Sequence, residues 1–185
     1  MNKINKLSGM SCYLVGPVDR AKDDGIGWRR EFREKINNRN IPIEVFDPTD
    51  KPSSLGNIIY NETGVEKHKI QEYKRNGNIQ EAINIIHKVR RYDLRMVDTT
   101  DFIVIYVDID VHMCGSYDEL FTAERQHKPL LAIVNPPLYE NVPDWLLDVI
   151  KQKEFFISVD ECLDYLENIN NGIIEMDDRW VKLVL

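Results

Sequence analysis

The chain has 185 residues and a formal net charge of −7, and this length is typical of one domain with its own hydrophobic core. The acidic balance leaves no general positive field at the surface, which argues against a nucleic-acid partner and favours a small ligand. No apolar run approaches the ~20 residues that cross a bilayer, and the first residues lack a secretion signal, so we expect a cytoplasmic protein with no membrane partner.

The cysteines and histidines predict neither disulfides nor a metal centre. Cys12, Cys114 and Cys162 are odd in number and form no Cys-x-x-Cys pair. The four histidines show no ligand spacing among themselves. We therefore expect reduced thiols, no protein-bound metal and no cofactor.

The first third of the chain predicts a strand, helix, strand unit. Residues 11–15 form an apolar strand that a Gly-Pro turn closes, and a loop rich in charge and glycine follows. Residues 28–36 have apolar side chains at helical spacing. Residues 41–46 are the second strand, which an Asp-Pro turn closes, so the unit should cross over right-handedly.

The middle of the chain combines a polar stretch with a helix and a buried strand. Residues 49–78 are polar, contain Pro and Gly breakers, and are too long for an ordinary connection. We interpret them as an insertion over the site. From Ile79 an apolar stripe at helical spacing leads toward Asp93, and residues 102–107 then form a strand that is apolar on both faces.

The second half continues the alternation. Its predicted elements are a helix over 119–126, a strand over 129–134, a helix that begins near Pro143, a short strand over 155–157 and a helix over 162–169. The tail over 172–185 is too apolar for a free end. We expect it to form an added edge strand or a surface that packs on a second subunit.

Alternating strands and helices with short links predict an α/β fold with a single doubly wound, mostly parallel sheet flanked by helices, flavodoxin-like or Rossmann-like. Residues 1–185 then form one domain with an insertion around 49–78. The turn at Gly16 and Pro17 is followed by neither Gly-x-Gly-x-x-Gly nor Gly-x-x-x-x-Gly-Lys spacing. This disfavours dinucleotide dehydrogenases and P-loop proteins.

Carboxylates gather where the parallel strands should end. The strand over 102–107 runs into a loop that contains Asp110, and a turn at Gly115 and Ser116 leads into Glu119 at the start of a helix. The carboxyl edge of the sheet is the usual ligand position in open α/β folds. A carboxylate there can act as a nucleophile or a general acid.

Four pieces of the sequence, in this order, resemble the nucleoside 2-deoxyribosyltransferase family over roughly residues 12–134. They are the strand end with Tyr13, Gly16 and Pro17, then Asp47 and Pro48, then Asp93 eight residues before Asp101, and then Gly115, Ser116, Tyr117, Asp118, Glu119 and Leu120 followed by Ala123.

The resemblance implies an enzyme that acts on the N-glycosidic bond of 2-deoxynucleosides or their 5-monophosphates. The family's nucleophile is the glutamate that opens the helix after the third strand, the position of Glu119. It forms a covalent glycosyl-enzyme, which another base or water resolves with retention of configuration. The amino end of its helix should favour the ionised form, by about 0.3 to 1 kcal/mol. Asp93 is the candidate for contacting the base or supporting its proton transfer.

The resemblance also implies substrate contacts and an assembly. Contacts are expected from Tyr13, Gly16, Pro17, Asp47, Gly115 and Ser116. Family members often carry an aspartate and a glycine where this chain has Met113 and Phe121, and Asp110 is the nearest acid that can substitute. Arg20, Arg29 and Ser116 are candidates for a 5-phosphate. The family's sites are commonly completed by a neighbouring subunit, so we expect a homo-oligomer.

Other interpretations remain open. Glu119 can simply complement a helix dipole, Asp93 can be a solvated helix residue, and Asp101 can be a cap or turn residue at the strand entry. At the level of function, one alternative is a noncatalytic sensor that binds a nucleotide in the same cleft. Another is a ribosyl or NAD glycohydrolase with a similar glutamate mechanism.

Overall fold

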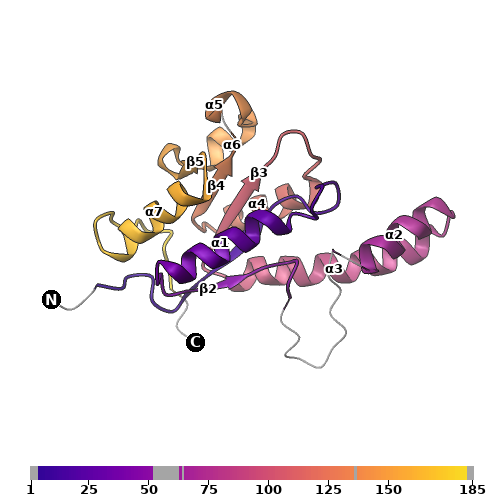
Figure 1. Cartoon of the computed structure of the whole chain (residues 1–185), viewed down its shortest axis with the longest axis horizontal. Helices are drawn as coiled ribbons and strands as arrows, with labels where there is room; N and C mark the ends of the chain where they lie inside the picture. Colours follow the sequence, from indigo (N-terminus) through magenta and orange to yellow (C-terminus); the bar gives the residue numbers. More distant parts are fainter. Residues whose placement is uncertain (1–3, 52–62, 64, 136, 183–185) are drawn as a thin grey trace.

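The computed structural model describes residues 4–51, 63, 65–135 and 137–182. Its strands, β1 (Met10–Val15), β2 (Ile43–Phe46), β3 (Phe102–Val107), β4 (Leu130–Val134) and β5 (Phe155–Phe156), form one sheet in the order β2-β1-β3-β4-β5 (Figure 1). Every strand pairing is parallel. The predicted α/β class and doubly wound sheet are confirmed.

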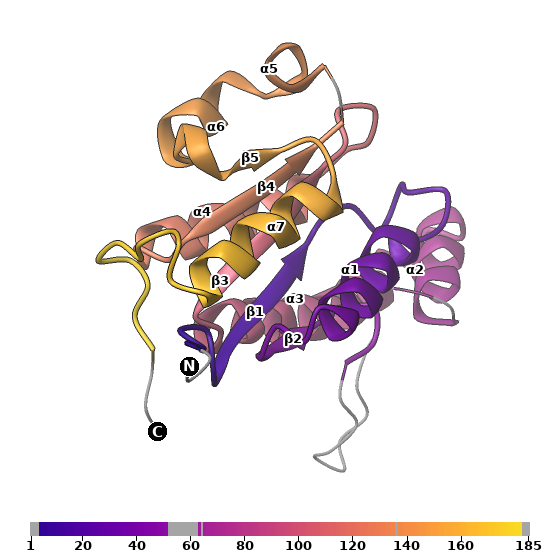
Figure 2. The same cartoon turned by 60° about the vertical axis from the view of Figure 1, so that its left-hand side comes forward.

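The helices are α1 (Ile26–Asn38), α2 (Val65–Arg75), α3 (Ile79–Thr99), α4 (Cys114–Arg125), the short α5 (Leu138–Asn141) and α6 (Asp144–Val149), the 3₁₀ turn η1 (Gln152–Glu154) and α7 (Val159–Asn170). In Figure 2 the short α5 and α6 lie beside β5, at the edge of the sheet opposite β2. Within the described residues, no helix has the length and apolar character needed to cross a membrane.

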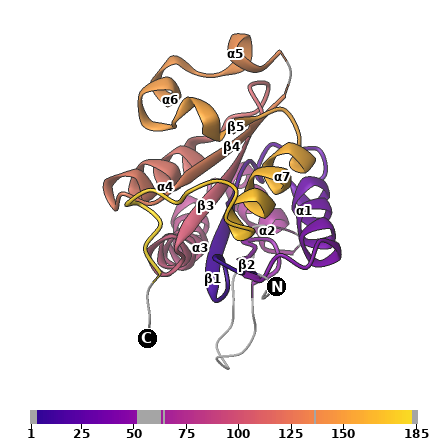
Figure 3. The ribbon, with the colours of Figure 1, turned by 90° about the vertical axis from the view of Figure 1, so that its left-hand side faces the viewer.

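The two faces of the sheet bury separate apolar layers because side chains alternate along a strand. In β1, Cys12 and Leu14 join one layer, whereas Tyr13 and Val15 join the other. Helices α1 and α7 cover the first face, and α3 and α4 cover the second, with the sheet between them in Figure 3. Strand β3 is buried except at Tyr106, as expected for a central strand covered on both faces.

Helix α2 packs against α3. We call the two helices the arm; its far end, α2, lies beyond the sheet in Figure 1. Helix α2 was not predicted from the sequence, and it occupies the second half of the polar stretch 49–78. Residues 52–62 and 64 of that stretch lie outside the described part of the chain. The apolar stripe of α3 is buried only in part: Ala82 and Val89 are buried, but Ile79, Ile83 and Ile86 are 50%, 47% and 45% exposed.

The C-terminal tail packs on its own chain. Over residues 172–182 the backbone forms no strand, so the predicted edge strand is wrong there. Trp180 is 9% exposed and lies against Phe102, with ring centroids 5.1 Å apart. Arg179 Nη1 donates to Glu154 Oε2 at 3.0 Å, and its Nη2 donates to Asp177 Oδ2 at 2.8 Å. Trp180 therefore packs over the first residue of β3, whereas Ile173 and Val181 of the tail are 71% and 59% exposed.

Replacing Arg179 tests this attachment. Glu154 is fully buried, and Arg179→Met leaves its carboxylate without the guanidinium. Loss of one partner of a buried ion pair typically costs about 3 to 5 kcal/mol, so we expect a loss of that order in the free energy of unfolding, measured by urea denaturation. The exposed Arg30→Met is the matched control and should change stability little.

The same variant should show a defined pH dependence. The hydrogen bond from Arg179 lowers the pKa of Asp177. This contribution to stability is therefore present above the ordinary aspartate pKa, about 3.9, and is lost as the pH falls through the lowered value. The gap between wild type and Arg179→Met should shrink in strong acid, and a gap that widens there would contradict the assignment.

Candidate active site

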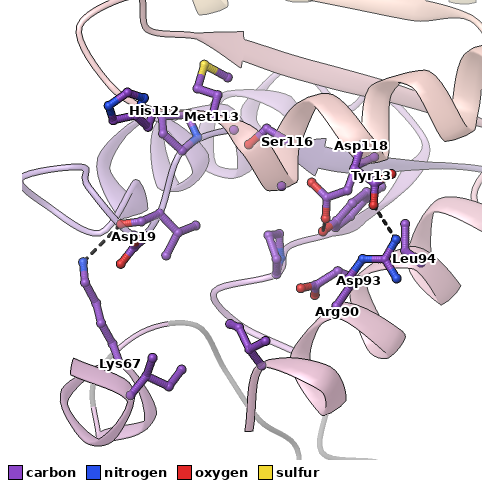
Figure 4. A pocket seen from close by; sticks show the side chains of 18 of the residues that line it. Tyr13, Asp19, Lys67, Arg90, Asp93, Leu94, His112, Met113, Ser116 and Asp118 are labelled. Atoms are coloured by element: carbon purple, nitrogen blue, oxygen red, sulfur yellow. Dashed lines mark hydrogen bonds and ion pairs between the residues drawn. The ribbon is translucent and has the colours of Figure 1, made fainter. Parts of the chain in front are cut away.

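The site lies where the strand order reverses. From β1 the chain crosses to β2 on one side, whereas β3 leads on to β4 and β5 on the other. The loops that follow β1 and β3 therefore diverge and leave a crevice at the carboxyl edge of the sheet. A cavity of about 290 Å³ occupies this position and is shown in Figure 4.

The walls of the cavity come from four parts of the chain. Tyr13, Gly16 and Pro17 line it from β1 and its turn, and Pro48 lines it from the turn after β2. The other two walls are the start of α4 and the arm. Residues 112, 113, 115, 116, 118 and 119 contribute from the loop and the start of α4, and residues 67, 70, 74, 86, 90, 93 and 94 contribute from the arm.

Glu119 meets Tyr13 inside the cavity. The Tyr13 hydroxyl donates to Glu119 Oε1 at 2.7 Å, and both residues line the cavity. Tyr13 is fully buried, so the phenol approaches from the core and fixes one carboxylate oxygen. The family resemblance implies a substrate contact for Tyr13, and the observed bond gives its phenol the geometry to orient the Glu119 carboxylate.

Helix α4 starts earlier than the sequence predicts. It begins at Cys114 rather than at Glu119, because the Gly-Ser pair that resembles a turn is already helical. Glu119 therefore lies in the second turn, and the dipole effect falls off within the first turn. The amino end of α4 therefore stabilises the Glu119 carboxylate less than expected. The described contact that holds this carboxylate is the hydrogen bond from Tyr13.

Asp93 also lines the cavity, and its partner is a lysine that the sequence did not identify. Lys51 Nζ lies 2.7 Å from Asp93 Oδ1, and the two side chains are only 2% and 4% exposed. An opposite charge at this distance favours the ionised carboxylate. The interpretation of Asp93 as a solvated helix residue is therefore wrong.

A buried arginine holds the turn after β1. Arg29 is fully buried, and its guanidinium donates to the carbonyls of Leu14, Gly16 and Gly25 at 3.3, 2.9 and 2.7 Å. Gly25 has φ 68°, and a Cβ there would lie 2.2 Å from the carbonyl oxygen of Pro17. Arg29 is thus a brace behind the cavity wall, and the expectation that it can hold a 5-phosphate is wrong.

The loop before α4 presents apolar rather than acidic contacts. Met113 is 4% exposed and lines the cavity, and its sulfur accepts from the Asp108 amide at 3.4 Å. Asp110 is exposed and does not line the cavity. Gly115 and Ser116 do line it, from the first turn of α4.

Two other predicted residues have structural partners. Asp47 lies outside the cavity lining, and its Oδ1 accepts from the amide and hydroxyl of Thr49 at 2.8 and 2.7 Å. Asp101 Oδ2 accepts from the amide and hydroxyl of Ser11 at 2.7 and 3.0 Å. Arg20 is exposed, lies 3.6 Å from Asp19 and is not part of the lining.

The arm adds three cations that sequence reasoning missed. Lys67 donates to the Val18 carbonyl at 3.1 Å and pairs with Asp24, and Arg90 Nη2 lies 2.7 Å from Asp118 Oδ2. Lys74 is the third. Lys67 and Lys74 belong to the polar stretch 49–78, and Arg90 lies on the helix predicted from Ile79, where no local signal marked it as a cavity residue. Among the described residues there is no group of three metal-ligating side chains.

Comparisons with known proteins show the fold. No family model and no curated protein matches the chain. A structure described as a conserved protein from Enterococcus faecalis V583 is similar with a TM-score of 0.54 and 13% identity, over 87% of this chain and 99% of that chain. The 2-deoxyribosyltransferase from Bacillus psychrosaccharolyticus is similar with a TM-score of 0.48 and 15% identity, over 82% and 88% of the two chains.

Proposed function

We propose that the protein transfers or hydrolyses the N-glycosidic bond of 2-deoxynucleosides or their 5-monophosphates through a covalent glycosyl-Glu119 intermediate. The observation that carries the proposal is the bond of 2.7 Å between Tyr13 and Glu119 in a cavity at the strand switch point. The family resemblance of the sequence points to the same glutamate. The cavity, about 290 Å³, is near the lower end of small-molecule pockets, about 300 Å³.

The proposed reaction has two displacements. One oxygen of Glu119 attacks C1′ of the sugar, the bond from C1′ to the base nitrogen breaks, and its electron pair leaves with the base, which takes up a proton from solvent water. Water or a second base then attacks C1′ and releases Glu119, so the configuration is retained. A 2-deoxy sugar suits this route because it has no electron-withdrawing 2-hydroxyl to oppose the oxocarbenium-like transition state.

The positive side chains of the arm favour the 5-monophosphates among these substrates. Lys67, Lys74 and Arg90 line one side of the cavity, although the chain as a whole carries a net charge of −7. Ser116 adds a hydroxyl at the start of α4. A substrate phosphate on the arm side would therefore meet Lys74, together with Lys67 and Arg90, which share their charge with Asp24 and Asp118.

Intact mass after exposure to substrate tests the nucleophile. Wild type should release free base and gain the mass of the deoxyribosyl group from a 2-deoxynucleoside, or of the 5-phosphodeoxyribosyl group from its monophosphate. Glu119→Gln should gain no adduct and should lose about 10³-fold or more in turnover, as expected on removal of a nucleophile. Glu124→Gln on the same helix, outside the cavity lining, is the control.

A substrate panel separates the alternatives. Faster cleavage of ribosyl substrates, including NAD, would favour a glycohydrolase. A nucleotide that raises thermal stability without being consumed, in Glu119→Gln as well as wild type, would favour a noncatalytic sensor. Met113 makes this part of the cavity wall apolar at a position where the family that the sequence resembles often carries an acid. This observation keeps the sensor as the second candidate.

Tyr13→Phe tests the hydrogen bond to Glu119. Loss of the hydroxyl leaves the carboxylate less well positioned, so kcat should fall about 10-fold to 100-fold, while the free energy of unfolding falls by about 1 kcal/mol. Tyr106→Phe removes a hydroxyl that bonds to Asn135 at 2.7 Å outside the cavity lining. It should affect stability alone. Equal activity in the two variants would contradict the assignment.

We also propose that the protein is a homo-oligomer. Ile79, Ile83 and Ile86 expose an apolar face of the arm, and Ile86 also lines the cavity. Such a face at the rim of a site suits contact with a second copy. Light scattering should give a dimer or larger, and Ile83→Glu should lower the mass, whereas Ile157→Glu beyond β5 should not. A monomeric wild type would contradict this.

A further inference from the structure

Lys51 is a buried amine beside the cavity that the reaction proposed above does not use. Its Nζ lies 2.7 Å from Asp93 Oδ1, but Lys51 is not part of the cavity lining, whereas Asp93 is. Among the described contacts, Asp93 is what connects Lys51 to the cavity.

Stability alone does not account for this pair. Taking both charges out of water opposes folding, and apolar residues of similar volume are often at least as stabilising as a buried ion pair. Lysine is almost never fully buried unless it is paired. One member of the pair lines the same cavity as Glu119, which indicates that the role of the pair concerns the substrate.

We propose that Lys51 is a positioning residue that keeps Asp93 ionised and fixed at the cavity wall, so that Asp93 accepts a hydrogen bond from an N–H of the leaving base. An ionised carboxylate is an acceptor only, so it contacts the base without donating the proton itself. The inference rests on the proposed function, because it needs a nucleobase in the cavity.

The other charged groups around the cavity are arranged differently. They are Tyr13 of β1, Lys67 and Lys74 of α2, Arg90 of α3, and Asp118 and Glu119 of α4. Asp19 and His112 contribute from the loops. Arg90 pairs with Asp118 at 2.7 Å and Lys67 with Asp24. Among the described ion pairs, the one that Asp93 makes is with Lys51, whereas Arg90 and Lys67 pair with other aspartates.

Two substitutions of Lys51 separate charge from packing. Lys51→Met removes the ammonium and keeps an apolar chain, whereas Lys51→Arg keeps a positive charge. In Lys51→Met we expect kcat/KM at neutral pH to fall about tenfold because Asp93 is held less precisely, and we expect the acid limb of its pH profile to move to higher pH. Lys51→Arg should retain most of the activity, and the exposed Lys153→Met should match wild type.

Carboxyl NMR of ¹³C-labelled aspartate gives a readout that needs no turnover. Asp93→Asn identifies the Asp93 signal. We expect that signal to titrate at higher pH in Lys51→Met than in wild type, and an unchanged titration would overturn the inference. If the titration shifts but wild type has no activity on the nucleoside and nucleotide panel, the proposed reaction fails while the pairing stands.

The double variant Lys51→Met/Asp93→Asn completes the test. If Lys51 acts through Asp93, the double variant should be no slower than Asp93→Asn alone, and a slower double variant would overturn the inference. If Lys51→Met does not fold, recovery of the fold in the double variant supports the pairing. A double variant that also fails to fold would show that Lys51 serves packing, which overturns it.

Discussion

The site depends on the parallel pairing of β1 with β3. Tyr13 lies opposite Ile103 and Val15 lies opposite Ile105, and all four side chains belong to the core layer under α3 and α4. A slip of one residue would move every side chain of a strand to the other face. The buried layer therefore fixes where along β1 the Tyr13 hydroxyl enters the cavity. Through the hydrogen bond from Tyr13, it also fixes the position of the Glu119 carboxylate.

The partners of the two carboxylates differ in charge. Glu119 receives a hydrogen bond from a phenol, which is a neutral donor. Asp93 lies beside an ammonium, so that pair is neutral overall. Two acids in one cavity with different surroundings can take different parts in one reaction.

The sequence predicted the sheet well because its signals are local. Apolar runs closed by Gly-Pro and Asp-Pro turns identified β1 and β2 to within two residues at either end, and the apolar run of β3 was equally clear. Helix α2 escaped prediction because its sequence is polar and its contacts are with α3. The start of α4 was missed because Gly115 and Ser116 are typical of turns as well as of first helical turns.

The pair of Lys51 and Asp93 shows why the other contacts of the site could not be predicted from the sequence. The two residues come from different elements, and no spacing rule connects a lysine after β2 with a helical aspartate. The pair also changes what the departure at Met113 means. Where members of the family that the sequence resembles often carry an acid, this cavity has an apolar wall, and in the proposed reaction contact with the base would fall to Asp93. A carboxylate with that task benefits from a fixed charge and a fixed position, which a buried ammonium supplies.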